Sequence, residues 1–343
     1  MTREIIYIDE KSGIPLLGLD FIGIIDRGTN LIELKPLTLC NLSCRYCFVS
    51  AGDYETNFIV DSQYFINGVK KLIELKGAYD IEIHLAPYGE IFLYKNLYTL
   101  IENLWELTGV KVISIQTNGL LLTPSIIKNL EHVNITRLNI SLNTLNESLA
   151  QYLSNCKYYD LEKLINNIHL LLETEIDVLL APVWFPGEND EDIQEIIKFI
   201  VDLRNKGYSN VDIQIGIQKY LIYKTGRKLK KIRPKTWGYF YKQLSDLEKK
   251  YDIKLKLGPQ DFNIHDRALF SLDIKEGDII SVVIKSPGRW KNECIGVIDN
   301  ISSCKILLNK PFEYSDQMIG QNINVKVLKS TNYDSIITSY FPY

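Results

Sequence analysis

The strongest constraint on the fold is a regular alternation of short apolar runs and longer amphipathic stretches between residues 31 and 216. The short runs are rich in Ile, Val and Leu, which favours strands. The longer stretches have apolar residues at helical spacing, and several begin after Asp, Asn or Ser or end at Gly. Six strand–helix units of this kind predict an α/β fold, with a parallel sheet forming a partial (β/α)6 TIM-like barrel and the helices outside it. Strands are expected at 31–37, 80–86, 110–117, 137–143, 176–183 and 210–216, and helices at 62–77, 96–109, 160–175 and 190–207.

The alternation stops after residue 216, and two further regions follow. A helical pattern covers 235–253, and from about residue 270 five short apolar runs separated by turns predict a small all-β barrel. The sequence therefore predicts a core at 1–218 with a short N-terminal extension at 1–18, a connecting region at 219–267, and a β-barrel at 268–343.

Half of the six cysteines form a Cys-x3-Cys-x2-Cys motif, Cys40, Cys44 and Cys47, just after the first core strand. The chain begins without a signal sequence and has no apolar run near the roughly 20 residues that span a bilayer, which predicts a cytoplasmic protein with reduced thiols. Zinc favours four ligands, yet the next cysteine is Cys156. Three thiolates can instead hold three corners of a [4Fe–4S] cluster and leave the fourth iron open for a small-molecule ligand. The motif favours such a cluster over zinc or chance clustering.

This motif, with the aromatic Tyr46 before its last cysteine, resembles the fingerprint of the radical S-adenosylmethionine (SAM) superfamily over roughly residues 19–220. The resemblance implies a [4Fe–4S] cluster whose open iron chelates SAM, and a reducing electron donor. It also implies reductive cleavage of SAM to a 5′-deoxyadenosyl radical that abstracts hydrogen from a substrate.

Several later positions match the SAM-binding pattern of that superfamily. The family usually has Gly-Gly-Glu-Pro after the second strand, and this chain keeps only the central Gly-Glu, within Tyr88-Gly89-Glu90-Ile91. Polar residues also end the third and fourth strands, where relatives bond the ribose or carboxylate of SAM. By this resemblance the residues expected to bind the cofactor are Tyr46, Gly89, Glu90, Thr117, Asn118, Ser141 and Asn143.

Two C-terminal features predict an RNA partner. The chain has a net charge of −3, but residues 219–270 carry 14 Lys and Arg against 5 Asp and Glu. Residues 219–235, called the basic segment below, contain eight of these cations, no acid, and neighbouring aromatics; such a segment suits phosphates and unpaired bases. Residues 276–300 and 320–330 resemble the TRAM domain, an OB-type barrel attached to RNA-modifying enzymes. The predicted RNA-binding residues are Lys224, Arg227, Lys228, Lys230, Lys231, Arg233, Arg289, Trp290 and Lys291.

Together these features predict a radical SAM enzyme, closest to archaeal-type proteins with a TRAM-like tail, that modifies a base of tRNA or rRNA. Carbon methylation is the leading expectation, with Cys156, Cys294 and Cys304 as candidate methyl carriers. Two alternatives remain. One is a radical enzyme acting on a peptide or small metabolite, in which the β-barrel is a structural cap. The other is an RNA-binding protein whose cluster is structural or redox-sensing.

Overall fold

A mixed seven-stranded sheet with the strand order β10-β8-β7-β6-β5-β3-β2 dominates the computed structural model, which describes residues 4–343. Strands β10, β8, β7 and β6 pair in parallel, as do β5 and β3, whereas β2 is antiparallel to β3. The parallel strands confirm the α/β core predicted from the alternation, and β2 is an addition that the alternation did not indicate. The bounds are β2 Gly23–Asp26, β3 Leu31–Lys35, β5 Ile81–Leu85, β6 Val110–Thr117, β7 Arg137–Ile140, β8 Asp177–Leu180 and β10 Ile213–Ile215.

The described residues fall into two units, and β6 contributes to both. The first unit contains residues 4–40, 52–113 and 264–343, and the second contains residues 41–51 and 114–263. Two small parallel sheets accompany the main one. They pair β1 (Glu4–Ile8) with β4 (Thr56–Val60), and β9 (Val183–Trp184) with β11 (Gln218–Lys219).

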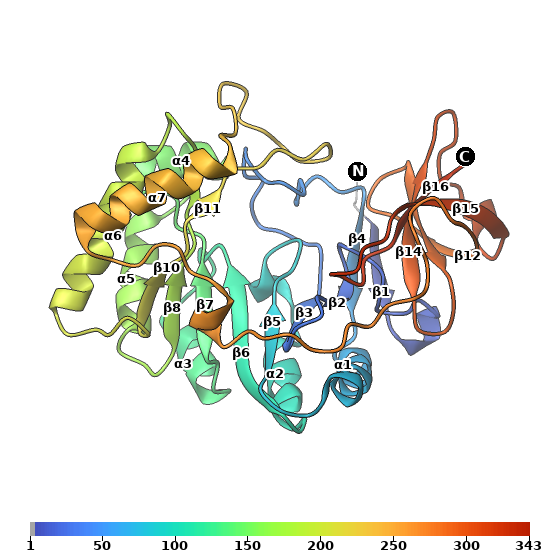
Figure 1. Cartoon of the computed structure of the whole chain (residues 1–343), viewed down its shortest axis with the longest axis horizontal. Coiled ribbons are helices and arrows are strands. Elements are labelled where there is room, and N and C mark those ends of the chain that lie inside the picture. The colour runs from blue at the N-terminus through green and yellow to red at the C-terminus, as the bar shows by residue number, and fades with distance from the viewer. Residues whose placement is uncertain (1–3) are drawn as a thin grey trace. The chain divides into compact units, whose positions relative to one another are not determined.

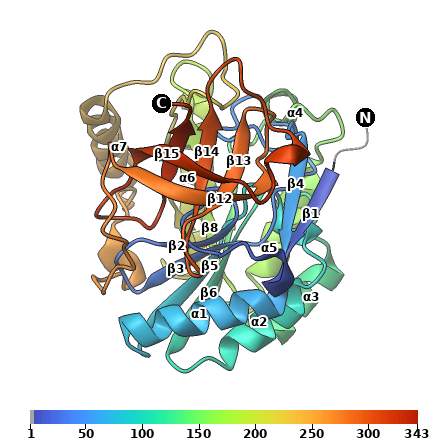
Figure 2. The same cartoon turned by 90° about the vertical axis from the view of Figure 1, so that its right-hand side faces the viewer.

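In the first unit, α1 (Ser62–Lys76) and α2 (Leu97–Trp105) pack side by side (Figure 2). The residues of β3 alternate between Ile32 and Leu34 on one face and Glu33 and Lys35 on the other. The apolar residues belong to the core, and the charged ones lie on the opposite face of the strand. This face of β3 is therefore polar although it is buried.

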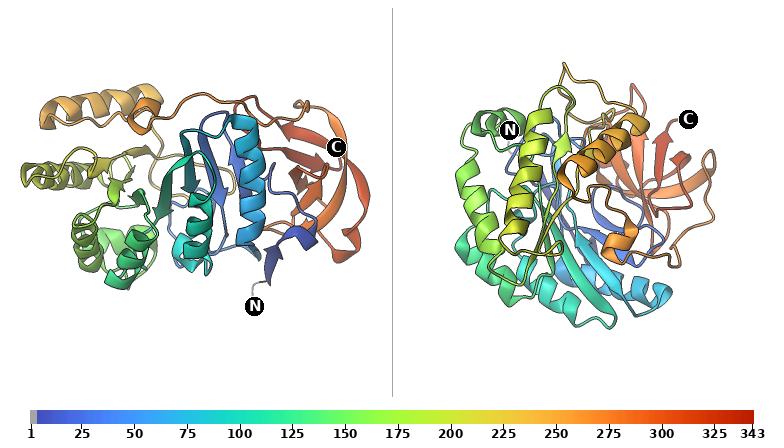
Figure 3. Two further views of the ribbon diagram at one scale, coloured as in Figure 1. Left: turned by 90° about the horizontal axis from the view of Figure 1, so that it is seen from below. Right: turned by 60° about the vertical axis from the view of Figure 1, so that its left-hand side comes forward.

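In the second unit, α3 packs on α5, α5 on β8, and α6 on both β10 and α7 (Figures 1 and 3). Most of these helices begin at a side-chain cap that accepts a backbone N–H, as Thr123, Asn146 and Asp160 do. Helices α1, α2, α5, α6 and α7 lie where the sequence predicts helices, whereas α3 and α4 were not predicted. The bounds are α3 Pro124–His132, α4 Glu147–Ser154, α5 Leu161–Leu171, α6 Asp190–Asn205 and α7 Trp237–Tyr251.

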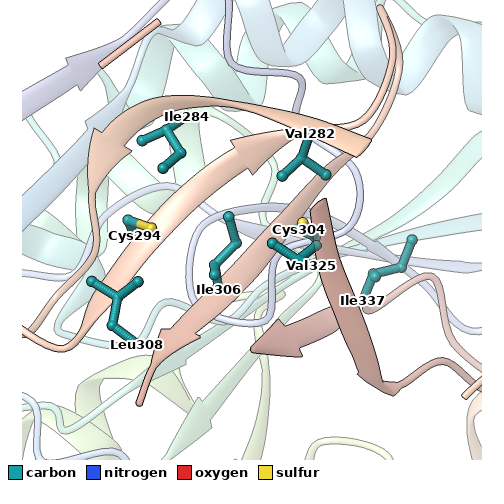
Figure 4. Packing of buried hydrophobic residues seen from close by; sticks show 8 residues of the cluster. All are labelled: Val282, Ile284, Cys294, Cys304, Ile306, Leu308, Val325 and Ile337. Atoms are coloured by element: carbon teal, nitrogen blue, oxygen red, sulfur yellow. The ribbon is translucent and has the colours of Figure 1, made fainter. Parts of the chain in front are cut away.

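The C-terminal residues form the five-stranded closed barrel predicted from the sequence, in the order β12-β13-β14-β16-β15. Closure leaves no unpaired sheet edge. Side chains from all five strands or their flanks fill the interior, including Val282, Ile284, Ile306 and Val325 (Figure 4). The bounds are β12 Ile279–Pro287, β13 Glu293–Val297, β14 Ser303–Leu308, β15 Asn322–Lys329 and β16 Thr338–Phe341.

Backbone hydrogen bonds and an ion pair join the barrel to the N-terminal residues of its own unit. The N–H of Ser303 donates to the carbonyl of Leu17 at 2.8 Å, and Lys305 Nζ lies 2.6 Å from Asp20 Oδ2. A Cβ on Gly18, whose φ is +104°, would lie 1.8 Å from the carbonyl oxygen of Ser303, so only glycine permits this approach. No helix within residues 4–343 is long and apolar enough to cross a membrane.

Candidate active site

The cysteine loop, defined here as residues 40–51, follows β3 and contains two consecutive turns. The N–H of Cys47 donates to the carbonyl of Cys44 at 3.2 Å, and the N–H of Ser50 donates to the carbonyl of Cys47 at 3.2 Å. Two such i-to-i+3 bonds constrain the backbone that carries the second and third cysteines. Cys40, Cys44 and Cys47 are all half-buried. The two turns therefore fix the backbone that carries the thiols of Cys44 and Cys47.

Arg45, in the centre of the first turn, attaches the loop to the end of α4. Its backbone N–H donates to the carbonyl of Leu153 at 2.9 Å, and its Nε donates to the carbonyl of Tyr152 at 2.8 Å. The guanidinium carbon also lies 4.8 Å from the centre of the Tyr152 ring. Helix α4, which the sequence did not predict, is thus a support of the loop.

Tyr46 is held by Asn143 and the segment after β8. Asn143 Nδ2 donates to the Tyr46 hydroxyl at 2.6 Å, and the rings of Tyr46 and Phe185 are 4.8 Å apart. The fully buried Asn189 in turn donates to the carbonyls of Asn143 at 2.9 Å and Val183 at 3.0 Å. Sequence reasoning missed Asn189 because an Asn before a helix is most simply a cap. Here it fixes the backbone of a predicted cofactor-binding residue.

The other predicted cofactor-binding residues of the second unit lie at the ends of β6 and β7. Asn118 Nδ2 donates to Asn41 Oδ1 in the cysteine loop at 2.8 Å, and Gln116 Nε2 donates to Ser141 Oγ at 3.2 Å. Thr117 is buried, and its hydroxyl accepts a backbone N–H two residues further on. In this unit Asn118 and Asn143 therefore contact the cysteine loop directly, whereas Ser141 contacts β6.

The Gly-Glu pair after β5 contacts the residue that precedes the first cysteine. The N–H of Glu90 donates to the carbonyl of Leu39 at 2.7 Å. A Cβ on Gly89 would lie 2.0 Å from that same carbonyl oxygen, so a larger residue would push the two segments apart. Glu90 is completely buried, and its carboxylate accepts the N–H of Phe92 at 3.2 Å. The sequence motif thus has a local structural reason besides the predicted role in cofactor binding.

Glu33 and Lys35 on the polar face of β3 form a linked set of charges with Arg27, which directly follows β2. Glu33 Oε1 lies 2.6 Å from Lys35 Nζ, and Glu33 Oε2 lies 2.7 Å from Arg27 Nη2. Burial favours the neutral form of Glu33, but the charges of Lys35 and Arg27 outweigh it and lower the pKa of Glu33 to about 2. Burial also lowers the pKa of Lys35, although the Glu33 carboxylate opposes this effect. The alternation of apolar and charged residues in "LIELK" is the sequence pattern of a strand with one charged face.

The basic segment differs from the prediction in the orientation of one residue. Lys224, Lys228, Lys230, Lys231 and Arg233 are exposed, as phosphate-binding side chains must be. Arg227 instead directs its guanidinium at the cysteine loop, where Nε donates to the carbonyl of Cys44 at 2.6 Å. The cations of this segment therefore divide into an exposed group and one that contacts the cluster motif.

The predicted RNA-binding residues of the barrel also divide by burial. Arg289 is 4% exposed and bonded to Glu293 through Nε at 3.1 Å, so its guanidinium lies inside the protein. Trp290 packs edge-on against Tyr54, with the ring centres 5.4 Å apart. Lys291 is exposed. A short polar loop gives no sequence signal that its arginine will be buried against a glutamate.

The three cysteines outside the motif differ in access. Cys294 and Cys304 belong to the apolar interior of the barrel (Figure 4), and both are fully buried. Burial raises the pKa of Cys294 and raises that of Cys304 to about 12, so neither is a ready thiolate. Cys156 is half-buried and follows Asn155, whose side chain donates to Ser43 in the cysteine loop at 3.3 Å. Cys156 therefore combines access with a location near the motif.

The chemistry of the motif suits an iron–sulfur cluster better than a single ion. Among residues 4–343, no three or more His, Cys, Asp or Glu side chains are grouped closely enough to hold one metal ion. A cluster does not require that convergence, because each of its irons takes its own thiolate. Three cysteines on one shaped loop fit this donor arrangement.

Two comparisons with known proteins identify the family. Residues 34–200 match the family model of the Radical SAM superfamily. Over 98% of its length the chain is 32% identical to an uncharacterized protein of Methanocaldococcus jannaschii, and the match covers 80% of that relative. The chain belongs to the radical SAM superfamily. Membership of the radical SAM superfamily implies a [4Fe–4S] cluster and SAM as cofactors.

Another relative matches about half of this chain. The chain is 30% identical to a probable GTP 3′,8-cyclase of M. jannaschii over 52% of its length, and spans 57% of that protein. Among solved structures it is similar to the [FeFe]-hydrogenase maturase HydG of Carboxydothermus hydrogenoformans, with a TM-score of 0.54 and 14% identity. That match covers 68% of this chain and 55% of HydG, and it shows the radical SAM fold.

Proposed function

We propose that this radical SAM enzyme modifies a base of structured RNA, tRNA or rRNA, and that the outcome is carbon methylation. The observation that carries the proposal is the direct bonding between the basic segment and the cysteine loop. Arg227 donates to the carbonyl of Cys44 at 2.6 Å, and Ser50 Oγ donates to the carbonyl of Thr225 at 2.8 Å. A polyanion bound to this segment would lie beside the motif where the radical is generated.

Different residues of the chain would bind the cluster and SAM. Cys40, Cys44 and Cys47 would hold the cluster, one thiolate to each of three irons. When bound with SAM and reduced, the cluster supplies a 5′-deoxyadenosyl radical, which suits unactivated C–H positions. Glu90 would accept the methionine ammonium of SAM, because a buried carboxylate gains most from a cationic partner. The remaining cofactor contacts would come from Tyr46, Gly89, Thr117, Asn118, Ser141 and Asn143.

Exposed aromatic side chains support an RNA substrate. Trp237 and Tyr241 on α7 are about half exposed and stacked, with ring centres 5.8 Å apart. Tyr223 is also half exposed, within the basic segment, and packs on Phe48 of the cysteine loop at 5.7 Å. Lysines neutralise phosphates, and aromatic faces stack on unpaired bases. The segment therefore offers both interactions that a single-stranded RNA loop requires.

The salt dependence of RNA affinity tests the proposal. Lys230→Glu/Lys231→Glu reverses two exposed charges of the basic segment, and Lys70→Glu/Lys71→Glu on α1 is a matched control with two adjacent exposed lysines. The slope of log affinity against log salt is negative. If two phosphate contacts are lost, its magnitude decreases by about 1.4 for a single-stranded site. The control should keep the wild-type slope. Equal slopes in both variants would exclude the segment as a phosphate site.

A second candidate function is supported by the charges on β3. Glu33, Lys35 and Arg27 are a charged set suited to a small polar metabolite or a peptide side chain. Mass spectrometry of nucleosides from cells with and without the gene separates the candidates. The loss of one modified nucleoside supports an RNA substrate, whereas an unchanged nucleoside profile supports the metabolite or peptide.

A structural or redox-sensing cluster would instead leave SAM intact. Reconstituted protein is expected to form 5′-deoxyadenosine anaerobically, and Cys44→Ala is expected to abolish this product. Cluster binding without SAM cleavage in the unmodified chain would support the non-catalytic alternative.

A further inference from the structure

Arg227 donates hydrogen bonds to several backbone carbonyls of the cysteine loop. Its Nε donates to the carbonyl of Cys44 at 2.6 Å, and its Nη2 donates to the carbonyl of Ala51 at 2.7 Å. Its backbone N–H donates to the carbonyl of Cys47 at 2.8 Å. One residue, 180 positions later in the chain, thus contacts both ends of the segment from Cys44 to Ala51.

Two of the acceptors, the carbonyls of Cys44 and Cys47, also close the two turns of the loop. The carbonyl of Cys44 accepts the N–H of Cys47, and the carbonyl of Cys47 accepts the N–H of Ser50. A carbonyl oxygen has two lone pairs and can accept a second donor without losing the first. Arg227 supplies that second donor to the first turn through its guanidinium and to the second turn through its backbone N–H. It therefore restrains the peptide groups that set the directions of the Cys44 and Cys47 side chains.

The residues before Arg227 are shaped for this approach. A Cβ on Gly226 would lie 2.5 Å from the carbonyl oxygen of Phe48, so the two backbones meet only because position 226 has no side chain. Ser50 Oγ donates to the carbonyl of Thr225 at 2.8 Å from the other side of the contact. The contact between residues 225–227 and the cysteine loop therefore involves backbone atoms and the side chain of Ser50 as well as Arg227.

We propose that Arg227 is a positioning residue for the cluster, which fixes the two turns so that Cys44 and Cys47 present their thiolates in one geometry. The guanidinium is suited to this role because its planar fork donates to two carbonyls at once, which a lysine ammonium on a flexible stem does not reproduce. Bonds from a charged donor are also stronger than neutral ones. The role concerns the loop itself and does not depend on the RNA substrate.

Three full-length variants test the proposal: Arg227→Gln, Arg227→Lys and, as a matched control, Lys228→Gln. Lys228 is the exposed neighbour with the same charge. Hydrogen exchange of the metal-free protein should show the amide of Cys47 exchanging about tenfold faster in both Arg227 variants, the factor expected for loss of a charged hydrogen bond. The amide of Ser50 should change less, because the carbonyl of Cys47 accepts the backbone N–H of residue 227, which both variants keep. After anaerobic reconstitution, a chelator should remove iron from both at about ten times the rate seen in the control.

The outcomes separate positioning from other roles. Faster exchange confined to the cysteine loop, with the melting temperature of the control, supports the proposal. Exchange and iron release equal to the control in Arg227→Gln would overturn it. Wild-type behaviour of Arg227→Lys would also overturn it, because a positive charge alone would then suffice. If Arg227→Gln does not fold, the comparison of Arg227→Lys with Lys228→Gln decides.

Discussion

Replacing Lys76 by methionine is expected to destabilise the first unit by about 3–5 kcal/mol, the usual cost of leaving one partner of a buried ion pair alone. Lys76 Nζ lies 2.6 Å from Asp26 Oδ1, and both side chains are completely buried. The ammonium also donates to the carbonyls of Thr29 at 2.8 Å and Ala268 at 2.9 Å. The variant therefore leaves a buried carboxylate without its counter-charge and two carbonyls without their donor.

The expected shift in melting temperature follows from the size of the unit. An unfolding entropy of about 2.1 cal/mol/K per residue gives about 0.4 kcal/mol/K for roughly 180 residues. A loss of 3–5 kcal/mol then lowers the melting temperature by about 8–13 °C if the unit unfolds on its own, and by about 4–7 °C if the whole chain unfolds at once.

Calorimetry of Lys76→Met, Asp26→Asn and the double variant measures the pair, with the exposed Lys70→Met on the same helix as control. Asp26 also accepts the N–H of Phe270 at 2.7 Å. In variants with a lower melting temperature, the amides of residues 266–270 should therefore exchange hydrogen faster than in the control. The double variant should be more stable than the sum of the single losses predicts, because it leaves no unpaired charge. A shift within about 1 °C of the control, or purely additive losses, would refute the reasoning.

Two further predictions concern charge and chemistry. Because the pKa of Glu33 is lowered to about 2 from 4.5, its ionised form stabilises the fold above pH 4.5, and this contribution of about 3 kcal/mol is lost as the pH falls towards 2. Chemical denaturation across pH 2–5 should therefore show a smaller loss of stability for Glu33→Gln than for the wild type. If Cys156 carries the methyl group, Cys156→Ala should prevent methylation of the substrate while 5′-deoxyadenosine still forms. Methylation at the wild-type rate would exclude that role.

The core strands and longer helices could be predicted because their apolar periodicity reports directly on burial. The six expected strand ranges each contain one observed parallel strand, although β7 and β8 end earlier than expected. Helices α3 and α4 escaped prediction because they bury only two and three residues, whereas α2, which is as long as α3, buries four. Strand β2 has four residues, and its antiparallel pairing depends on contacts with β3 that its sequence does not specify.

The cluster motif could be predicted because its three cysteines are adjacent in sequence, whereas the supports of the loop are distant. Asn189 and Arg227 act through carbonyls more than 40 and 170 residues away, so no local pattern indicates their partners. Arg289 was expected to contact RNA, but its partner Glu293 and its place over the Phe21 ring, 4.5 Å from the ring centre, depend on how the barrel packs. Composition predicts charge, and only the fold determines which charges reach solvent.

The composition of the basic segment suggests one role for all of its cations, whereas its structure separates Arg227 from the exposed lysines. Lys224 and Lys228 are exposed, yet Arg227 between them is bonded to the cysteine loop. The difference follows from Gly226, which lets the backbone approach Phe48 closely and so brings the next side chain within reach of the Cys44 carbonyl. A charge-reversal series over the segment is therefore expected to change RNA affinity at the lysines and cluster stability at Arg227. If all positions changed both properties alike, the segment would act only through its overall charge.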